Sequence, residues 1–392
     1  MTYNSYSAPV PVNVSNAEFA QLSNSNPYRP GRIIYAANIR PSENQSSQTP
    51  FTIAISTSDD IGKTWTGIRD VYKSKIWDRD VLRGCYEPCV LELPDGTVQI
   101  YFADETPYYE KRLTYQNISV IESKDGGDTW GPARIVCYNE KYRDGMPVAM
   151  IYKDWIYVAI EANGQNIKFH PQIVCTRISD NWKTPVYGSS LNRFDPFKTS
   201  MESAFIYAGA PYLIHTDNYF VLCYQSSEGG IGPLAPVKNA WFLVLYGDVI
   251  NAETIRTATQ LEFYDSVYGQ EHEGGTLIAD RRDFYLAFEA SEYGVEDGQS
   301  WYGWAHVSVD DDLRMTLLGS GIGLNGESVI AGAVPEPFGG LLLLLGMAVL
   351  ALRRRRPVKD RGGAGHSGRA ATCCGLGGRA GGTDWLYRAR SR

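Results

Sequence analysis

Short apolar segments separated by turn residues recur along most of the chain. The segment from Cys85 to Ser123 shows the pattern best, with the runs CYEPCVLEL, TVQIYFADE and NISVIES and the turn PDG after the first. Runs of this length, rich in Val, Ile, Tyr and Phe and bounded by Gly, Pro and Asp, predict β-strands. Similar groups begin near residues 145, 208 and 274, and a weaker group begins near residue 17. The chain is therefore predicted to be all-β.

The groups of strands repeat at intervals of roughly 55 to 65 residues, and five modules are clear. Repeats of this period, with up to four strands each, are typical of a β-propeller whose blades are four-stranded sheets. Residues 1–325 are predicted to form this propeller. If the four strands of a blade run outward from the axis, the start of the first strand and the end of the second lie on one face.

Two turns match the same pattern of Ser, Asp, Gly, Thr and Trp. They read SDDIGKTW from Ser58 to Trp65 and SKDGGDTW from Ser123 to Trp130, and a weaker relative, SDNWKTP, begins at Ser179. Ser and Asp side chains can bond turn amides, glycine allows a positive φ, and tryptophan can pack between sheets. Because these turns join the third and fourth strands of a module, they are predicted to be structural and to lie opposite the functional face.

The hairpin predicted between Arg143 and Gly164 places reactive side chains at one edge of a sheet. It reads RDGMPVAMIYKDWIYVAIEANG, which predicts two strands joined by the short turn KD. So short a turn between antiparallel strands brings the start of the first beside the end of the second. We therefore expect Arg143, Asp144 and Glu161 to lie together.

Equivalent positions in the other modules carry further polar side chains, which should meet around the axis. The candidates are Tyr86, Glu87, Asp104, Glu105, Arg143, Asp144, Glu161, Glu202, Gln225, Glu228, His272, Glu273 and Glu289. A ring of carboxylates suits glycoside hydrolysis, because one acid must protonate the departing oxygen and a second must attack the anomeric carbon or activate water. Neighbouring carboxylates also raise one another's pKa, which keeps one protonated near neutral pH.

The quoted motifs resemble those of known families. The two SxDxGxTW turns resemble the Asp boxes of sialidase-type propellers. Four segments, CYEPCVLELPDGTVQIYFADE, QNISVIESKDGGDTWG, RDGMPVAMIYKDWIYVAIEA and AGAPYLIHTDNYFVLCYQSSEG, together resemble the exo-arabinanase glycoside hydrolases over about residues 83 to 230. This resemblance implies a six-bladed, sialidase-like, retaining enzyme that releases arabinobiose from the end of linear α-1,5-arabinan. One of the six blades would then be degenerate, split between the termini or absent.

The resemblance also implies roles for two glutamates. The family's acid/base ends the second strand of the RDGMPV blade, which corresponds to Glu161. Its nucleophile closes the corresponding strand of the next blade, shortly after a glutamine, which corresponds to Glu228 after Gln225. Contacts with the substrate are expected from the side chains of Tyr86, Glu87, Arg143, Asp144 and Gln225.

Two other functions are compatible with the sequence. An exo-sialidase of the same fold needs three arginines for the substrate carboxylate and a tyrosine nucleophile activated by a glutamate. Arg143 is a candidate for one of these arginines, whereas the segments AGAPY and HEGGT offer none. A non-catalytic glycan-binding propeller would instead stack sugars on aromatic side chains such as Tyr86, Tyr108, Tyr109 and Trp301.

Charge and the C-terminal segment bear on partners and location. Residues 1–352 hold 26 Lys and Arg against 42 Asp and Glu, and residues 353–392 hold 11 against 2. An acidic body argues against nucleic acid as a partner. Residues 334–356 contain VPEP, an apolar run and four arginines, in that order. This order resembles the PEP-CTERM sorting signal of exported bacterial envelope proteins, which implies an envelope or extracellular location and contact with export and sorting machinery.

The remaining features set smaller expectations. The first fifteen residues show no signal-peptide pattern, and residues 357–392, basic and rich in Gly and Arg, are predicted to be a disordered tail. The five cysteines before this tail are expected to be small buried hydrophobic residues. No histidine pattern or phosphate-binding loop indicates a metal or cofactor. The chain is expected to act as a monomer on a polysaccharide or oligosaccharide.

Overall fold

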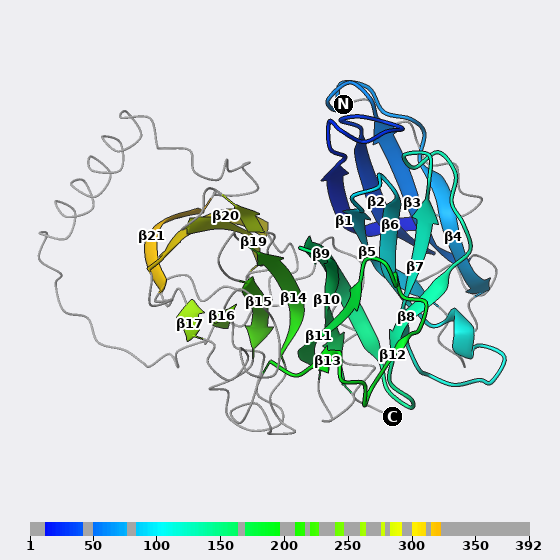
Figure 1. Ribbon diagram of the computed structural model, residues 1–392. Coiled ribbons are helices and arrows are strands. Elements are labelled where there is room, and N and C mark those ends of the chain that lie inside the picture. The colour runs from blue at the N-terminus through cyan, green and yellow to red at the C-terminus, as the bar shows by residue number, and fades with distance from the viewer. Residues whose placement is uncertain are drawn as a thin grey trace, which may run out of the picture.

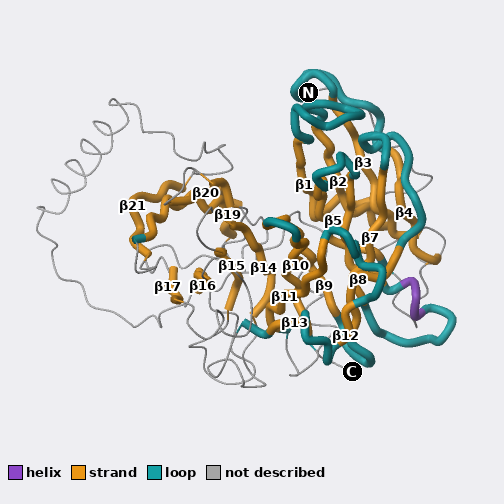
Figure 2. The backbone as a smooth tube through the Cα atoms, viewed as in Figure 1, coloured by secondary structure: helices purple, strands orange, loops and turns teal. Residues whose placement is uncertain are grey.

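The computed structural model describes residues 12–41, 50–76, 84–163, 169–196, 208–215, 220–226, 240–246, 259–263, 276–278, 283–291, 300–310 and 315–322. Four predicted site residues, Glu202, Glu228, His272 and Glu273, lie outside this part of the chain, as do the segments 334–356 and 357–392. The prediction of an all-β chain is confirmed for the described residues, which form strands and one short 3-10 helix, η1 (Thr106–Tyr108) (Figure 2).

The strands form five sheets, which we number in chain order. The first sheet has the order β1 (Val12–Gln21), β2 (Ile33–Pro41), β3 (Pro50–Ser58), β4 (Arg69–Ile76). The second contains β5 (Cys85–Glu92), β6 (Val98–Asp104), β7 (Asn117–Ser123), β8 (Arg134–Tyr138) and, beyond β8, β12 (Val186–Tyr187). The third has the order β9 (Asp144–Tyr152), β10 (Trp155–Ala162), β11 (His170–Arg177), β13 (Arg193–Phe194).

The fourth and fifth sheets follow the same scheme. The fourth has the order β14 (Ala208–His215), β15 (Phe220–Ser226), β16 (Ala240–Tyr246), β17 (Thr259–Phe263). The fifth has the order β18 (Thr276–Ile278), β19 (Asp283–Ser291), β20 (Ser300–Val309), β21 (Met315–Ile322). Neighbours in each of these two sheets pair antiparallel.

The first four sheets pack against one another through their first strands. β1 contacts β5, β5 contacts β9 and β9 contacts β14, and Figure 1 shows the sheets following one another in chain order. One hydrophobic cluster joins the first three sheets, and a second joins the third and fourth. Every residue of β6 is buried, as expected of a strand that is covered on both faces. The five described cysteines are also buried and free of disulfides, as predicted.

The outer edge of the third module differs from the expected pattern. The segment after β11 supplies two short strands instead of one, and they join different sheets. β12 pairs in parallel with β8 of the second sheet, whereas β13 pairs with β11 of its own sheet. Trp182, which precedes β12, is buried and donates from Nε1 to the Tyr101 hydroxyl of β6 at 2.9 Å. This crossover fastens the third module to the second.

A β-bulge with a left-handed residue occurs in the first strand of each of the first four sheets. These residues are Asn16, Glu87, Met146 and Ala210, with φ of 49°, 58°, 46° and 48°. The pairing with the second strand shifts register at the same place in all four. In three of the four the next residue is proline, which cannot donate to a ladder and is tolerated at bulges. The bulge is therefore a repeated backbone feature that fixes the register near the site.

Side chains of one first strand bind backbone N–H groups of the next. Glu18 Oε2 accepts the Val90 N–H at 2.8 Å, and the Cys89 Sγ accepts the Ala149 N–H at 3.2 Å. Cys89 Sγ also lies 3.7 Å from Glu18 Oε1. These contacts connect β1 to β5 and β5 to β9, so the packing between sheets is supported by polar contacts as well as by the apolar clusters.

Replacing Glu18 with glutamine is expected to flatten the pH dependence of stability. Burial raises the pKa of Glu18 from 4.5 to about 7, against the lowering effect of the Val90 and Cys89 hydrogen bonds. Because the folded pKa exceeds the unfolded one, the folded state binds more protons between these values, and stability falls as pH rises from about 4.5 through about 7. The effect is at most on the order of 3 kcal/mol.

Denaturant unfolding at pH 5, 6, 7 and 8 measures this effect. The glutamine variant should match the wild type at pH 5 and be the more stable of the two at pH 8, because the amide can still accept the Val90 N–H but carries no charge. Parallel stability curves for the two proteins would contradict the prediction. Other buried acids contribute equally to both curves and cancel in the difference.

The two SxDxGxTW turns make the same hydrogen bonds in both copies. The serine hydroxyl accepts the glycine N–H, in the pairs Ser58–Gly62 and Ser123–Gly127. The aspartate two residues after the serine accepts the threonine N–H, in the pairs Asp60–Thr64 and Asp125–Thr129. All four distances are 2.7 to 2.9 Å. The turns connect β3 to β4 and β7 to β8. Asp60 and Asp125 thus hold their own turns together, as expected of structural residues.

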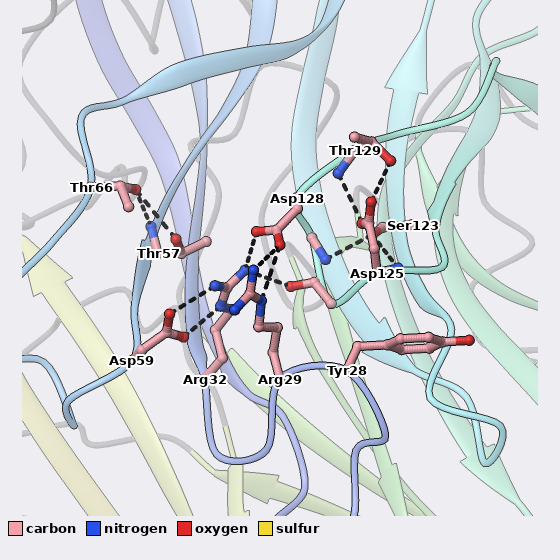
Figure 3. A network of polar contacts seen from close by, with 12 residues as sticks. Tyr28, Arg29, Arg32, Thr57, Asp59, Thr66, Ser123, Asp125, Asp128 and Thr129 are labelled. Atoms are coloured by element: carbon pink, nitrogen blue, oxygen red, sulfur yellow. Dashed lines mark hydrogen bonds and ion pairs between the residues drawn. The ribbon is translucent and has the colours of Figure 1, made fainter.

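Arg32 connects the two turns. Its Nε and Nη2 donate to Asp59 at 2.6 and 2.8 Å, and its Nη1 donates to Asp128 at 2.6 Å (Figure 3). Arg29 also binds Asp128. Arg32 comes just before β2 begins, so this network lies at the edge of the first sheet where β2 starts. It connects the first two sheets at that edge.

Candidate active site

The predicted site residues of the second and third modules meet where β6 and β10 end and β5 and β9 begin. Gly145 marks the meeting point. A Cβ at Gly145 would lie 2.8 Å from Gln116 Nε2, 3.7 Å from Glu87 Oε2 and 3.9 Å from the Glu161 carbonyl oxygen. No side chain fits there without displacing Gln116. Glycine therefore allows the second and third sheets to bring Glu87 and the Glu161 strand together.

Arg143 forms the centre of a buried polar network. Its Nη1 lies 2.7 Å from Glu105 Oε1, and its Nη2 donates to Gln116 Oε1. Gln116 Nε2 in turn donates to the Asp144 carbonyl at 2.9 Å. The Arg143 N–H donates to Asn163 Oδ1 at 2.7 Å, beside the end of β10. The guanidinium thus links the second module to the third and holds the start of β9 in place.

Glu105 also fixes the ring of Tyr86. Its Oε2 accepts the Tyr86 hydroxyl at 3.0 Å and the Gly84 N–H at 2.8 Å. A Cβ at Gly84 would lie 1.7 Å from the Tyr86 hydroxyl, so this ring position requires glycine at 84. Burial raises the pKa of Tyr86 well above its usual value, and the Glu105 carboxylate raises it further. Tyr86 is therefore a neutral hydrogen-bond donor that is almost fully buried.

Glu87 is the left-handed residue of the bulge in β5 and is half-buried. Its Oε2 accepts the Met146 N–H at 2.9 Å. Burial raises the pKa of Glu87, while the Met146 N–H and the guanidiniums of Arg40 and Arg143 lower it. The equivalent residues of the other sheets are Asn16, Met146 and Ala210, so the bulge itself does not require a carboxylate. A glutamate at this place is consistent with the predicted contact with substrate.

Asp144 forms a buried ion pair with Arg193, and its contact with substrate stays a prediction. It is fully buried, and its two carboxylate oxygens accept from Arg193 at 2.7 and 2.9 Å. Although burial alone would lower the pKa of Arg193, the Asp144 carboxylate raises it above its usual value. Arg193 lies on β13, nearly fifty residues further along the chain, so no local sequence pattern indicates this pair.

Glu161 lies near the end of β10, between Gly145 of β9 and Pro171 of β11, and is 5% exposed. Each of the first four sheets has an equivalent residue on its second strand. It pairs with the first-strand residue that comes just before the left-handed bulge residue. These residues are Asn38, Ala103, Glu161 and Gln225. Glu161 is the one carboxylate among the four, and Gln225 is its equivalent in the fourth sheet. Glu228, three positions further on, lies outside the described residues.

Arg40 joins the site from the first sheet and was not among the predicted site residues. It lies near the end of β2, the strand that corresponds to β10. Its Cζ lies 5.5 Å from the centre of the Tyr86 ring. The run RIIYAANIR could have indicated Arg40 as a site residue, because this arginine lies near the end of the second strand of its module, as Glu161 does in the third module. The weak pattern of the first module obscured that correspondence.

The described residues include no group of three or more His, Cys, Asp or Glu side chains that could hold a metal ion. The same part of the chain contains no helix long and apolar enough to cross a membrane. The side chains of the described site offer carboxylates, guanidiniums, amides and a phenol.

Comparisons with known proteins give only distant similarities. No protein-family model matches the chain, and no curated protein does. A GH93 alpha-L-arabinofuranosidase of Fusarium graminearum in complex with arabinobiose superposes with a TM-score of 0.47 and 14% identity, over 79% of this chain and 92% of that one. An alpha-L-arabinanase of Cellvibrio cellulosa complexed with arabinohexaose gives 0.44 and 10%, over 78% and 95%.

An ulvan lyase of polysaccharide lyase family PL25 gives a TM-score of 0.47 and 11% identity, over 78% of this chain and 69% of that one. Since all three TM-scores are below 0.5 and all three identities are far below 25%, these similarities assign neither a family nor an activity to the chain. The function therefore has to be inferred from the residues of the site.

Proposed function

We propose that the chain is a glycoside hydrolase that acts on the ends of an arabinan-like or related polysaccharide. One observation carries the proposal: the Glu87 carboxylate of the second module lies at Gly145, where Glu161 of β10 pairs with β9 just after Arg143. Glycoside hydrolysis needs two carboxyl groups that flank the scissile bond. In this proposal Glu161 is the acid/base and Glu228 the nucleophile of a retaining reaction, and Gln225 binds substrate beside them.

The fold part of the proposal is a β-propeller with the five sheets as blades. It is supported by the packing of β1, β5, β9 and β14 on one another in chain order, and by the bulge that recurs in all four strands. The segment at 334–356 is proposed to be a sorting signal, which would place the enzyme in the cell envelope or outside the cell. The chain is proposed to act as a monomer.

Chemical geometry argues against the exo-sialidase alternative. A tyrosine nucleophile must be accessible and must lose its proton readily. Tyr86, the tyrosine paired with a glutamate in this site, is 2% exposed, and burial raises its pKa. A non-catalytic glycan-binding propeller differs from the proposed enzyme in a single result, which is the absence of released sugar.

Product analysis tests the proposed function. The full chain is incubated with debranched arabinan, sialyl-lactose and a panel of plant and algal polysaccharides, and products are separated by thin-layer chromatography. We expect short oligosaccharides of one size from the chain ends of arabinan or a related polymer, and none from sialyl-lactose. Release of free sialic acid would favour the sialidase alternative, and binding without release from any polymer would favour the non-catalytic one.

A further inference from the structure

Arg40 is held in a fixed orientation at the proposed site. Its Nε donates to Asn38 Oδ1 at 2.6 Å, and its Nη2 donates to Asn16 Oδ1 at 2.5 Å. Asn38 is fully buried, and its own Nδ2 donates to the Cys85 carbonyl at 2.6 Å, which fixes the direction of its amide. The guanidinium packs on the face of Tyr86, whose hydroxyl is held by Glu105. Two of its three nitrogens are therefore committed, and within the described residues no partner binds Nη1.

Arg40 is half-buried, and its charge is not balanced as those of three arginines with more deeply buried side chains are. Arg32 faces Asp59 and Asp128, Arg143 faces Glu105, and Arg193 faces Asp144, each within 2.9 Å. The partners of Arg40 are neutral amide oxygens and an aromatic ring, and no described carboxylate lies within ion-pair distance of it. Burial raises the pKa of the nearby Glu87 carboxyl group, and the Arg40 guanidinium lowers it.

We propose that Arg40 binds an anionic oxygen group, a carboxylate or a sulfate ester, on the sugar bound at this site. The substrate would then be an acidic glycan instead of a purely neutral one, which specifies the substrate class of the proposed function and rests on it. The geometry supports recognition because a guanidinium with a fixed plane and a free donor binds oxyanions with little loss of side-chain entropy. Half-burial at the site strengthens such a contact relative to one in bulk water.

A structural role for Arg40 is the competing explanation, because the guanidinium also packs on Tyr86 and joins the first sheet to the second. That role predicts an effect on stability but none on the choice between acidic and neutral ligands. The ratio of two affinities, measured on the same protein, therefore separates the explanations even if a variant is less stable than the wild type.

The experiment measures binding by isothermal titration calorimetry with full chains that carry Glu161→Gln, so that ligands are not consumed. The probes are oligogalacturonides for carboxylate, sulfated galactan oligosaccharides for sulfate, and neutral arabino-oligosaccharides. Arg40→Gln and Arg40→Lys are compared with the matched control Arg177→Gln. Arg177 also packs on an aromatic ring, with its Cζ 4.6 Å from the centre of the Trp155 ring. It lies at the end of β11, away from Glu161.

We expect one acidic probe to bind about 10- to 100-fold more tightly than the neutral one, the range expected of a hydrogen-bonded ion pair. Arg40→Gln should remove this preference, Arg40→Lys should retain part of it, and Arg177→Gln should leave it intact. The preference should also weaken in high salt. The probe that shows the preference identifies the anion as carboxylate or sulfate.

Equal affinity for acidic and neutral probes in the Glu161→Gln protein, or a preference that survives Arg40→Gln, would overturn the proposal. Failure of the proposed function looks different, because it appears as a lack of product from every polymer with the wild-type chain. Hydrolysis of neutral arabinan without any acidic preference would keep the proposed function and reject the role of Arg40. If the wild-type chain hydrolyses no polymer but shows an acidic preference that depends on Arg40, the role of Arg40 is kept and the proposed function is rejected.

Discussion

Replacing Glu161 with glutamine is expected to abolish the release of reducing ends from debranched arabinan. Glutamine has nearly the same shape as glutamate, but it can neither donate nor accept the proton that the reaction transfers. General acid–base catalysis contributes roughly 10²- to 10⁴-fold to rate, so the residual activity should fall below about one hundredth of that of the wild type. The fold should persist, because Glu161 lies at the end of β10 and the apolar residues of that strand are unchanged.

Two further measurements separate an acid/base role from any other role of Glu161. An aryl glycoside with a dinitrophenol leaving group needs little protonation, so Glu161→Gln should lose much less activity on it than on the polymer. In a retaining enzyme, sodium azide should partly restore turnover of this aryl glycoside by Glu161→Ala. Azide needs no base to attack the glycosyl-enzyme intermediate in place of water, and the product is then a glycosyl azide. Undiminished activity of Glu161→Gln on arabinan would remove Glu161 from the acid/base role, and Glu87→Gln would then be tested next.

Replacing Asp144 with asparagine is expected to destabilise the protein by about 3 to 5 kcal/mol. The reason is that Arg193 would be left with a buried charge and no carboxylate, and its side chain is only 3% exposed. Guanidinium chloride unfolding should show a lower midpoint with an unchanged slope, because the area exposed on unfolding stays the same. High salt should not rescue the variant, since a buried pair is screened little.

The matched control is an ion pair whose lysine is exposed to solvent. Lys73 and Asp70 lie 3.1 Å apart with the lysine side chain 61% exposed, so Lys73→Gln should change stability by less than about 1 kcal/mol. The double variant Asp144→Asn with Arg193→Gln should be less destabilised than the sum of its two single variants, because neither partner is then left charged. Additive effects, or a cost as small as that of Lys73→Gln, would contradict the structural assignment of Asp144.

The local pattern of residues was sufficient for the hairpin on which the proposed site depends. The predicted strands GMPVAMIY and WIYVAIEA correspond to β9 (Asp144–Tyr152) and β10 (Trp155–Ala162), with Lys153 and Asp154 in the turn. The reason is physical: a buried strand needs a continuous β-branched and aromatic run, and a short turn needs residues that tolerate its backbone angles. Lys153 adopts a φ of 53° in that turn.

The partner of each site residue could not be read in the same way, because it depends on segments that are distant in sequence. Asp144 was expected to face substrate, yet Arg193 occupies both of its oxygens. Arg40 reaches Tyr86 from the first sheet, whose weak pattern obscured the position of this arginine near the end of a second strand. Likewise, the two-residue strand β12 is too short to carry a pattern, and it pairs with the second sheet instead of its own.

Residue types and their spacing thus determined which strands form and which end of each sheet carries polar side chains. Which carboxylates pair with which arginines depended on the packing of whole sheets. The left-handed bulges in β1, β5, β9 and β14 shift the register at the level of the site. That shift accompanies the hydrogen bond from the Met146 N–H to Glu87, a contact between two sheets that no single strand encodes.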